Sequence, residues 1–305
     1  MQNYGICSCI CHFFLVSLRT FCAHDMKLSV MTINSYNAAG LQKTMESVFA
    51  QTYKDFEYIV VDGASDDGSV VVVKEFEQKI NPSLQGWDGV GYFTWISEPD
   101  KGIYNAMNKG IRMSHGEYTL MLNSGDYLVG EHVIERIIPE LDGTDIVQGN
   151  IIKVETEKEI VCRGYGRSEI TFIDVMKNHF LHQASFCHRD LFVRYGYFDE
   201  SYKINGDTVF YAKCLGFGNA SFRYVDINIA YFDTTGISAD PNGKWTIPRR
   251  EEDERYVQMF SKRMWDLFYK EEKKISLYNK LHAHRWSWAL TMAIAHLCNR
   301  LYKDK

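Results

Sequence analysis

The sequence predicts an α/β protein with a Rossmann-like, mostly parallel central sheet, helices on its faces, and a helical extension at the C-terminus. Two observations support this prediction. Over roughly the first 130 residues, short apolar runs alternate with segments of helical periodicity, which is typical of a parallel sheet with crossover helices. From about residue 246 onward the strand-like runs stop and the remaining periodicity is helical.

The first half of the chain is expected to contain four strands separated by three helices. Each predicted strand is an apolar run, and turn-forming residues follow most of them. Consecutive parallel strands need crossover connections, so the helices are expected on both faces of the sheet. The expected strands cover residues 28–33, 56–61, 92–96 and 118–122, and the expected helices cover 41–51, 69–80 and 103–111.

The alternation weakens after residue 126, and fewer elements can be placed. The expected elements are a short helix over 133–138, a strand over 145–154, a helix beginning at Asp190 and a helix over 207–215. We therefore divide the folded chain into a domain over residues 26–245, with halves 26–130 and 131–245, and a helical region over 246–305.

The first 25 residues are expected to lie outside the fold. Their apolar run over 10–18 is too short to span a bilayer, and it lacks the basic start of a signal peptide. A second methionine, Met26, stands just before the first predicted strand. We expect that the natural protein starts at Met26 and that residues 1–25 are an upstream translation artefact.

The composition is that of a globular protein able to bury a core. The chain has 305 residues, of which 46% are hydrophobic and 24% charged, and its formal net charge is −5. This charge gives no bias toward nucleic acid, so no nucleic-acid partner is expected. The eight cysteines are not spaced as a disulfide framework, which fits a reducing cytoplasm.

Basic residues gather at the C-terminal end. Residues 261–305 contain ten Lys and Arg against four Asp and Glu, whereas the rest of the chain has 24 basic and 35 acidic residues. The last helical segment, 285–302, carries Trp286 and Trp288 near its start. Such a helix suits the interface of an anionic membrane, and the alternative is a solvated arm or a helix packed on the domain. We expect peripheral membrane contact through this region.

Acidic side chains follow two of the predicted strands. Asp62 comes directly after the strand at 56–61, and Asp126 closes the run Asn123-Ser124-Gly125-Asp126 after the strand at 118–122. The carboxyl ends of parallel strands border the crevice in which open α/β sheets bind ligands. Carboxylates at that place suit a divalent metal and a phosphate-bearing, hydroxyl-rich ligand.

An ordered set of motifs resembles family 2 of the glycosyltransferases, which have the GT-A fold. Each motif alone is weak, but the ordered set is specific and spans roughly residues 27–235. The resemblance implies a GT-A domain over 26–245, with a nucleotide-sugar half and an acceptor half. The motifs are SVMTINSYN at 29–37, DGASDDGS at 62–69, SEPDKGIYNAMNKG at 97–110, LNSGD at 122–126, HQ at 182–183 and GD at 206–207.

The resemblance implies a set of donor contacts, with a UDP-sugar as the favoured donor. Asp62 is expected to accept a hydrogen bond from the imide N–H of a uracil-like base. Asp100 is expected to contact ribose or sugar hydroxyls, and the backbone at Lys101 and Gly102 to approach the donor closely. The alternative for Asp62 is a turn or capping role, and Asp67 is expected to cap a helix or order its loop. The implied donor-binding residues are Asn34, Asp62, Asp100, Lys101, Asn108, Ser124, His182 and Gln183.

The resemblance also assigns two carboxylates to the chemistry. Asp126 is implied to hold Mg²⁺ or Mn²⁺, which would neutralise the charge that develops on the diphosphate leaving group. Ser124 stands where the family often has a second acidic residue. Asp207 is implied to be the general base that deprotonates the acceptor hydroxyl in one inverting displacement. The alternative for Asp207 is helix capping, and Val209 replaces a residue that is often acidic in the family.

Two other functions compete with this assignment. A nucleotidylyltransferase needs a basic, glycine-rich loop after the first strand, and residues 34–40 contain neither Lys nor Arg. A non-catalytic binding subunit of a polysaccharide-assembly complex would be expected to lack Asp126 or Asp207, and both are present. Neither a Gly-x-Gly-x-x-Gly turn nor a Gly-Lys-Ser/Thr phosphate loop occurs.

The sequence therefore predicts an inverting, metal-dependent glycosyltransferase of bacterial type. Its expected acceptor is a glycan or a polyprenyl-linked oligosaccharide that is extended during cell-surface polysaccharide biosynthesis. The expected location is the cytoplasm, with the protein peripheral on the inner face of the plasma membrane.

Overall fold

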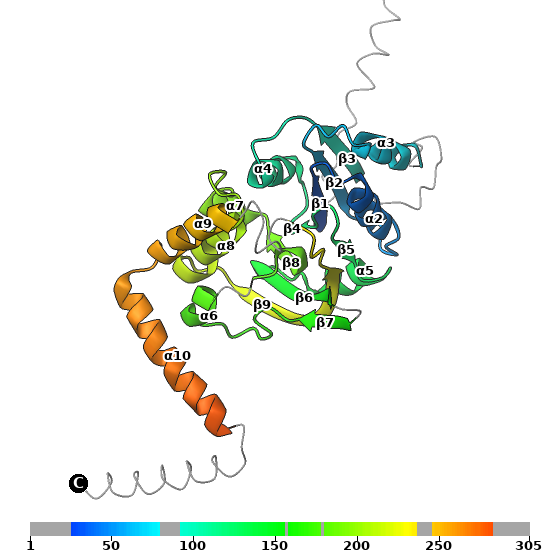
Figure 1. Cartoon of the computed structure of the whole chain (residues 1–305). Helices are drawn as coiled ribbons and strands as arrows, with labels where there is room; N and C mark the ends of the chain where they lie inside the picture. The colour runs from blue at the N-terminus through cyan, green and yellow to red at the C-terminus, as the bar shows by residue number, and fades with distance from the viewer. Residues whose placement is uncertain (1–25, 80–91, 156–157, 178–179, 237–245, 283–305) are drawn as a thin grey trace, which may run out of the picture. The chain divides into compact units, whose positions relative to one another are not determined.

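The computed structural model describes residues 26–79, 92–155, 158–177, 180–236 and 246–282. The proposed leader at 1–25 and the tryptophan-bearing segment at 285–302 lie outside these ranges. The chain separates into one unit that ends at Thr246 and a second that begins at Ile247, and each is described by itself. The expected α/β class is confirmed, because the first unit is a single sheet flanked by helices (Figure 1).

The first four strands form a parallel array in the order β3-β2-β1-β4. All residues of β1, β2 and β4 are buried, which explains why these strands appear in the sequence as mostly apolar runs. The register pairs Asn34 with Asp62 and Asp62 with Ser97, so the polar ends of three strands lie side by side. The strands are β1 (Leu28–Asn34), β2 (Glu57–Asp62), β3 (Tyr92–Ser97) and β4 (Tyr118–Met121).

Three crossover helices connect these strands. They are α2 (Ala38–Phe49), α3 (Ser69–Lys79) and α4 (Ile103–Met113). Helix α2 begins where the Asn37 side chain accepts a hydrogen bond from the Gly40 N–H, and its apolar residues Leu41, Met45 and Val48 are buried. Figure 1 shows α4 on the opposite side of the strands from α2 and α3, as the alternating pattern predicted.

The rest of the sheet is mixed rather than parallel. Strand β8 runs antiparallel to both β4 and β6, and only β6 and β9 pair in parallel. Parallel pairing is therefore confined mainly to the first half, and the full order is β3-β2-β1-β4-β8-β6-β9-β5, with β7 on β6. These strands are β5 (Tyr127–Leu128), β6 (Ile146–Glu155), β7 (Lys158–Cys162), β8 (Ser185–His188) and β9 (Phe222–Tyr231).

The sequence pattern predicts β6 but not β5, β7, β8 or β9. Strands β5 and β8 have only two and four residues, which is too short for a periodic signal. Most residues of β7 and β9 are only partly buried or exposed, so these strands lack a continuous apolar run.

Short helices complete the first unit, and two longer ones belong to the second. The expected helices at 133–138, from Asp190, and over 207–215 are present, the last as α8 continued by a π-helix. In the described ranges, no helix is both long and apolar enough to cross a membrane. The helices are α5 (Val133–Ile137), η1 (Ile138–Glu140), α6 (Phe172–Lys177), η2 (His182–Ala184), α7 (Asp190–Tyr195), α8 (Gly206–Tyr211), η3 (Ala212–Phe217), α9 (Thr246–Gln258) and α10 (Lys262–His282).

An aromatic cluster fixes α8 in the second half of the domain. Phe210 stacks on Phe192 with ring centroids 5.0 Å apart, and Phe198 lies edge-on to Phe210 at the same distance. Tyr211 packs against both Phe198 and Phe210. All four side chains are buried, so the start of α8, which carries Asp207, rests on a rigid base.

The buried strands predict a large difference between two valine truncations. Val60 in β2 is fully buried, whereas Val193 in α7 is 83% exposed. Val60→Ala should lower the free energy of unfolding by about 2 kcal/mol, because it removes buried methyl groups and leaves a cavity, and Val193→Ala should change it little. Urea unfolding followed by circular dichroism measures both, and equal losses would contradict the buried position of β2.

Candidate active site

Two motifs from the second half of the domain meet as an ion pair. His182 Nδ1 lies 3.1 Å from Asp207 Oδ2, and the two side chains are only 17% and 16% exposed. Burial raises the pKa of Asp207, but the hydrogen bond and charge of His182 outweigh it and hold that pKa below its usual range. Burial lowers the pKa of His182, but the bond to Asp207 and the charges of Asp207 and Asp126 raise it overall. Asp207 is therefore a carboxylate with a matched cationic partner.

A tyrosine from the first half holds the other oxygen of the same carboxylate. The Tyr104 hydroxyl in α4 lies 3.1 Å from Asp207 Oδ1 and also contacts the carbonyl oxygen of Ile204. Tyr104 is buried, and a Cβ at Gly206 would stand only 2.7 Å from its ring. Only glycine at position 206 allows this close approach, so the glycine of the Gly206-Asp207 motif has a packing role.

The loop after β4 reaches the same pair through Asn123. Its Nδ2 lies 3.3 Å from His182 Nε2, and its Oδ1 is buried without a hydrogen-bond partner among the described residues. A protonated imidazole has no acceptor atom, so in that state the Asn123 amide must turn and present its oxygen to Nε2–H. The turned amide would give both His182 nitrogens an acceptor, in keeping with the raised pKa of the imidazole.

Asp126 is buried beside a second carboxylate. Its Oδ1 accepts the backbone N–H of Asp233 at 2.8 Å, and its carbonyl oxygen accepts the Thr44 hydroxyl at 2.7 Å. Burial raises the pKa of Asp126 to about 7, and the negative charge of Asp233 acts in the same direction, against the Asp233 N–H bond and the charge of His182. Gly125 has a φ of +104° and no room for a Cβ beside the Asp233 carboxylate, so this turn requires glycine.

Asp233 and Tyr104 are site residues that the sequence did not predict. Asp233 follows β9, whose half-buried pattern gives no strand signal, so nothing marks it as the end of a strand. Tyr104 lies within the motif at 97–110, but a tyrosine on the buried side of a helix is indistinguishable from a core residue in sequence.

Asp62 joins the carboxyl ends of three strands and is fully buried. Its Oδ1 accepts Asn34 Nδ2 at 2.7 Å, and its Oδ2 accepts the Ser65 N–H and the Ser97 hydroxyl at 2.9 and 2.6 Å. Burial raises the pKa of Asp62, but the bonds from Ser97, Ser65 and Asn34 together lower it below the usual value. Both oxygens are engaged within the protein, and the expected contact with a nucleotide base stays a prediction.

The neighbouring residues of this edge lie close to Asp62. Asp100 Oδ1 accepts the Gly102 N–H at 2.8 Å, and its Oδ2 stands 2.6 Å from where a Cβ of Gly63 would be. Asp67 caps α3 by accepting the Ser69 N–H and hydroxyl, and it also accepts the Ala38 N–H, so its expected structural role is confirmed.

The remaining predicted donor residues are spread along the same edge. Lys101 is exposed, and its backbone N–H donates to Asn105 Oδ1 at 3.2 Å. Ser124 is partly buried and its N–H donates to the Ile33 carbonyl, while Gln183 is buried next to His182. The structure gives these residues positions, and their contacts with a donor stay predictions.

Asn108 makes hydrogen bonds within the protein that the sequence did not predict. Its Nδ2 donates to the Phe198 carbonyl and to Glu200 Oε1, both at 2.9 Å, and its Oδ1 accepts the Phe198 N–H at 3.0 Å. The side chain is 1% exposed and its amide groups are all engaged, so it fastens α4 to the turn at 198–200. The expected contact of Asn108 with a donor molecule stays a prediction.

The described ranges contain no group of three or more His, Cys, Asp or Glu residues spaced to hold a metal ion. Asp126 and Asp233 are nonetheless two carboxylates close enough for their charges to interact. Oxygen ligands suit Mg²⁺ and Mn²⁺, and both ions commonly complete their coordination with phosphate oxygens and water. The residues present fit such an ion only if substrate supplies the other ligands.

The profile of the family described as "Glycosyl transferase family 2" matches residues 29–216. An uncharacterized glycosyltransferase of Mycobacterium tuberculosis is 30% identical over 228 residues, which cover 70% of this chain and 77% of that protein. A PGL/p-HBAD biosynthesis glycosyltransferase of Mycobacterium bovis is 27% identical over 202 residues, covering 65% and 73%.

Two solved structures show the same fold. S. aureus TarS 1-349 in complex with UDP-GlcNAc has a TM-score of 0.55 at 19% identity, covering 68% of this chain and 58% of that one. The mannosyltransferase PcManGT of Pyrobaculum calidifontis, in complex with GDP-Man and Mn²⁺, has a TM-score of 0.53 at 18% identity, covering 73% and 60%. The present chain thus spans about three fifths of the length of these structures.

The ion pair predicts a pH-dependent effect of removing its cation. His182→Gln should lower the free energy of unfolding by about 2 kcal/mol at about pH 6, because Asp207 keeps its charge without a partner. This loss is smaller than that for fully buried pairs, since both side chains are partly exposed. His182 has a raised pKa, so its contribution is fully present below the ordinary imidazole pKa and is lost as the pH rises through the raised value.

Urea unfolding at about pH 6 and about pH 9 measures this difference. His132→Gln is the matched control, because His132 is 65% exposed and its contacts with Glu135 and Thr52 lie on the surface. The difference in the free energy of unfolding between wild type and His182→Gln should be smaller at the higher pH. A difference that is the same at both pH values would contradict an ion pair.

Asn108→Ala should destabilise the protein without weakening nucleotide binding. We expect a loss of about 2–3 kcal/mol in the free energy of unfolding, because partners at Phe198 and Glu200 are left unpaired. Asn219→Ala, at an exposed asparagine, is the control. Urea unfolding measures the structural role of Asn108, and calorimetric titration with UDP measures its predicted role in donor binding. Normal stability together with lost UDP affinity would contradict the structural role and support the donor contact.

Proposed function

Because the chain belongs to glycosyl transferase family 2 and is a glycosyltransferase, we propose that it transfers a sugar from a nucleotide-sugar donor to a hydroxyl of a glycan acceptor with inversion. The observation that supports this most directly is the ionised Asp207, held between His182 and Tyr104. The motif that implies a catalytic carboxylate and a charged, positioned carboxylate at this residue together support the proposal.

In the proposed step the acceptor oxygen attacks the anomeric carbon as the bond from that carbon to the diphosphate breaks. The acceptor proton passes to Asp207, and the nucleoside diphosphate leaves on the opposite face of the sugar. His182 and Tyr104 keep the carboxylate charged and aimed before the proton arrives. A single displacement of this kind inverts the anomeric centre.

A divalent metal fits the other end of the site. Asp126 and Asp233 supply carboxylate oxygens, and we propose that they hold Mg²⁺ or Mn²⁺ together with the donor diphosphate. A bound ion would neutralise charge on the leaving group. The structure of the similar mannosyltransferase holds GDP-Man and Mn²⁺, which supports this assignment for a shared fold.

A UDP-sugar is the donor we favour. The similar TarS structure holds UDP-GlcNAc, and Asp62 and Asp100 lie together at the ends of β2 and β3. Asn34 Oδ1 is buried without a partner among the described residues, next to Asp62, and is an acceptor suited to the imide N–H of uracil. If Asn34 Oδ1 accepts the imide N–H, the base can be recognised while Asp62 keeps its internal hydrogen bonds.

We propose a lipid-linked oligosaccharide as acceptor, in cell-surface glycan assembly at the inner face of the plasma membrane. Support comes from a relative named for PGL/p-HBAD biosynthesis and from the excess of basic residues over 261–305. Membrane contact in this proposal is peripheral. Its tryptophan-bearing segment lies outside the described residues, so the basic charge carries the argument.

Asp207→Asn should lower the turnover number by about 10²–10⁴-fold while nucleotide affinity is retained, because the variant cannot accept the acceptor proton. Nucleoside diphosphate release is measured over a panel of nucleotide sugars with a polyprenyl-linked acceptor, with and without chelator. Asp190→Asn is the matched control, since Asp190 also lies in the first turn of a helix but is 69% exposed.

Chelator should abolish turnover and added Mn²⁺ or Mg²⁺ should restore it. Unchanged turnover in Asp207→Asn would remove the proposed base. Absence of turnover with every donor would favour the non-catalytic binding subunit instead.

A further inference from the structure

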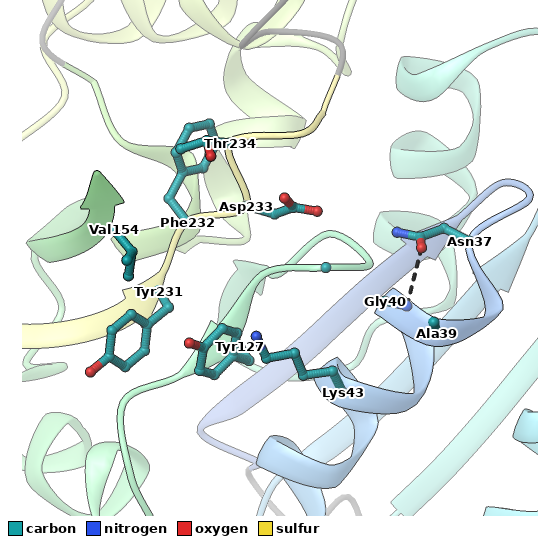
Figure 2. Close-up of a pocket in the computed structure, with 11 residues that line it drawn as sticks. Asn37, Ala39, Gly40, Lys43, Tyr127, Val154, Tyr231, Phe232, Asp233 and Thr234 are labelled. Carbon is teal, nitrogen blue, oxygen red and sulfur yellow. Dashed lines mark hydrogen bonds between the residues drawn. The ribbon is translucent and has the colours of Figure 1, made fainter. Parts of the chain in front are cut away.

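A pocket of about 400 Å³ opens beside the proposed metal end of the site. It is lined by residues from the start of α2, from the turn before β5, and from the end of β9 (Figure 2). Two of its lining residues, Gly125 and Asp233, are those that fix Asp126. A molecule in this pocket therefore lies next to the proposed site of sugar transfer. The volume falls within the range of about 300–1,000 Å³ that is typical of small-ligand sites.

One wall of the pocket is aromatic. The rings of Tyr127 and Tyr231 stack with centroids 4.7 Å apart and an angle of 13° between their planes. Val154 extends this wall and is 49% exposed, so it adds apolar surface that no other part of the described protein covers. The Tyr127 ring lies between the Tyr231 ring and the Lys43 ammonium group, and the Tyr231 hydroxyl donates to Glu159 Oε1 at 2.7 Å. The wall therefore offers a sugar the apolar edges of the two rings and the Val154 side chain.

The cation of the pocket is Lys43. Its Nζ stands 3.8 Å from the centroid of the Tyr127 ring, on which Figure 2 shows it lying. None of the ion pairs among the described residues involves Lys43. The lining carboxylate, Asp233, accepts the Thr235 N–H and hydroxyl through Oδ1 and stands against Gly125 with Oδ2. The positive charge of Lys43 is thus held in place by a ring and is not neutralised by a carboxylate.

We propose that this pocket, the Lys43 pocket, binds a sugar residue of the acceptor that carries a negative charge. The sugar ring would lie against Val154 and the edges of the Tyr127 and Tyr231 rings, and its carboxylate or phosphate group would pair with Lys43. Among the described residues, Asn37 Nδ2 donates to the Ser124 carbonyl alone, at 3.3 Å, so its second N–H can donate to a sugar hydroxyl. The inference rests on the proposed function, which supplies the acceptor, but concerns binding rather than transfer.

The test is an equilibrium titration of the full chain by NMR without donor or metal. The probes are methyl β-D-glucuronide, glucose 6-phosphate and the neutral methyl β-D-glucoside. At least one anionic probe should bind about tenfold more tightly than the glucoside, as expected for one charge-assisted hydrogen bond, and the tighter of the two identifies carboxylate or phosphate as the natural group. Added salt should weaken the anionic probes alone.

Lys43→Gln should remove the preference for an anionic probe over the neutral glucoside. Lys74→Gln, at an exposed lysine of α3, is the matched control and should keep the preference. Equal affinity for all three probes, or equal behaviour of the two variants, would overturn the proposal.

A further outcome assigns the pocket to the donor. If UDP displaces the anionic probe competitively and Lys43→Gln weakens UDP by the same factor, the pocket holds the donor diphosphate and the acceptor assignment is wrong. Because no turnover is measured, these outcomes are independent of Asp207→Asn. Loss of transfer in that variant and loss of anion preference in Lys43→Gln therefore test separate claims.

Discussion

The ion pair between His182 and Asp207 is the interaction on which the site depends. It joins a 3₁₀ turn before β8 to the first turn of α8, and Tyr104 ties the same carboxylate to α4 from the other half of the domain. A carboxylate this enclosed would otherwise be driven toward its neutral form, which has no use as a base. The packing of Gly206 on Tyr104 and the aromatic cluster beneath α8 fix the pair in position. The chemistry of the site therefore follows from how the two halves of the sheet are joined.

Much of the first half could be predicted from sequence, for a physical reason. Strands β1, β2 and β4 are buried throughout, so their sequences are mostly apolar, and α2 and α4 bury one face at helical spacing. Asn34 and Asp62 end β1 and β2 side by side, and Asp126 follows five residues after the end of β4. Asp207 and His182 were singled out from motifs alone, and the structure places them in direct contact, while their roles stay predictions.

The parts that sequence did not predict depend on contacts between distant segments. Strands β8 and β9 are short or half-buried, and their pairing with β4 and β6 makes the sheet mixed. Asp233 becomes a site residue only because β9 ends beside Asp126. The partners of Asn108, the backbone of Phe198 and the side chain of Glu200, lie about ninety residues away in the chain, so sequence reasoning did not predict them. A polar residue on a helix carries no sign of which distant backbone it will meet.

The Asn108 cross-link has a consequence for chimeric enzymes. Asn105 and Asn108 bind the two carboxylate oxygens of Glu200, so α4 and the 198–200 turn form one mechanical piece although they come from opposite halves of the chain. A chimera in which the 97–110 segment is exchanged between relatives to alter sugar specificity receives α4 without the 198–200 turn to which it is bonded. The amides of the transplanted helix would then not match the hydrogen-bonding groups of the recipient's own 198–200 turn. We expect the helix to shift relative to Asp207. Such exchanges call for both segments to travel together.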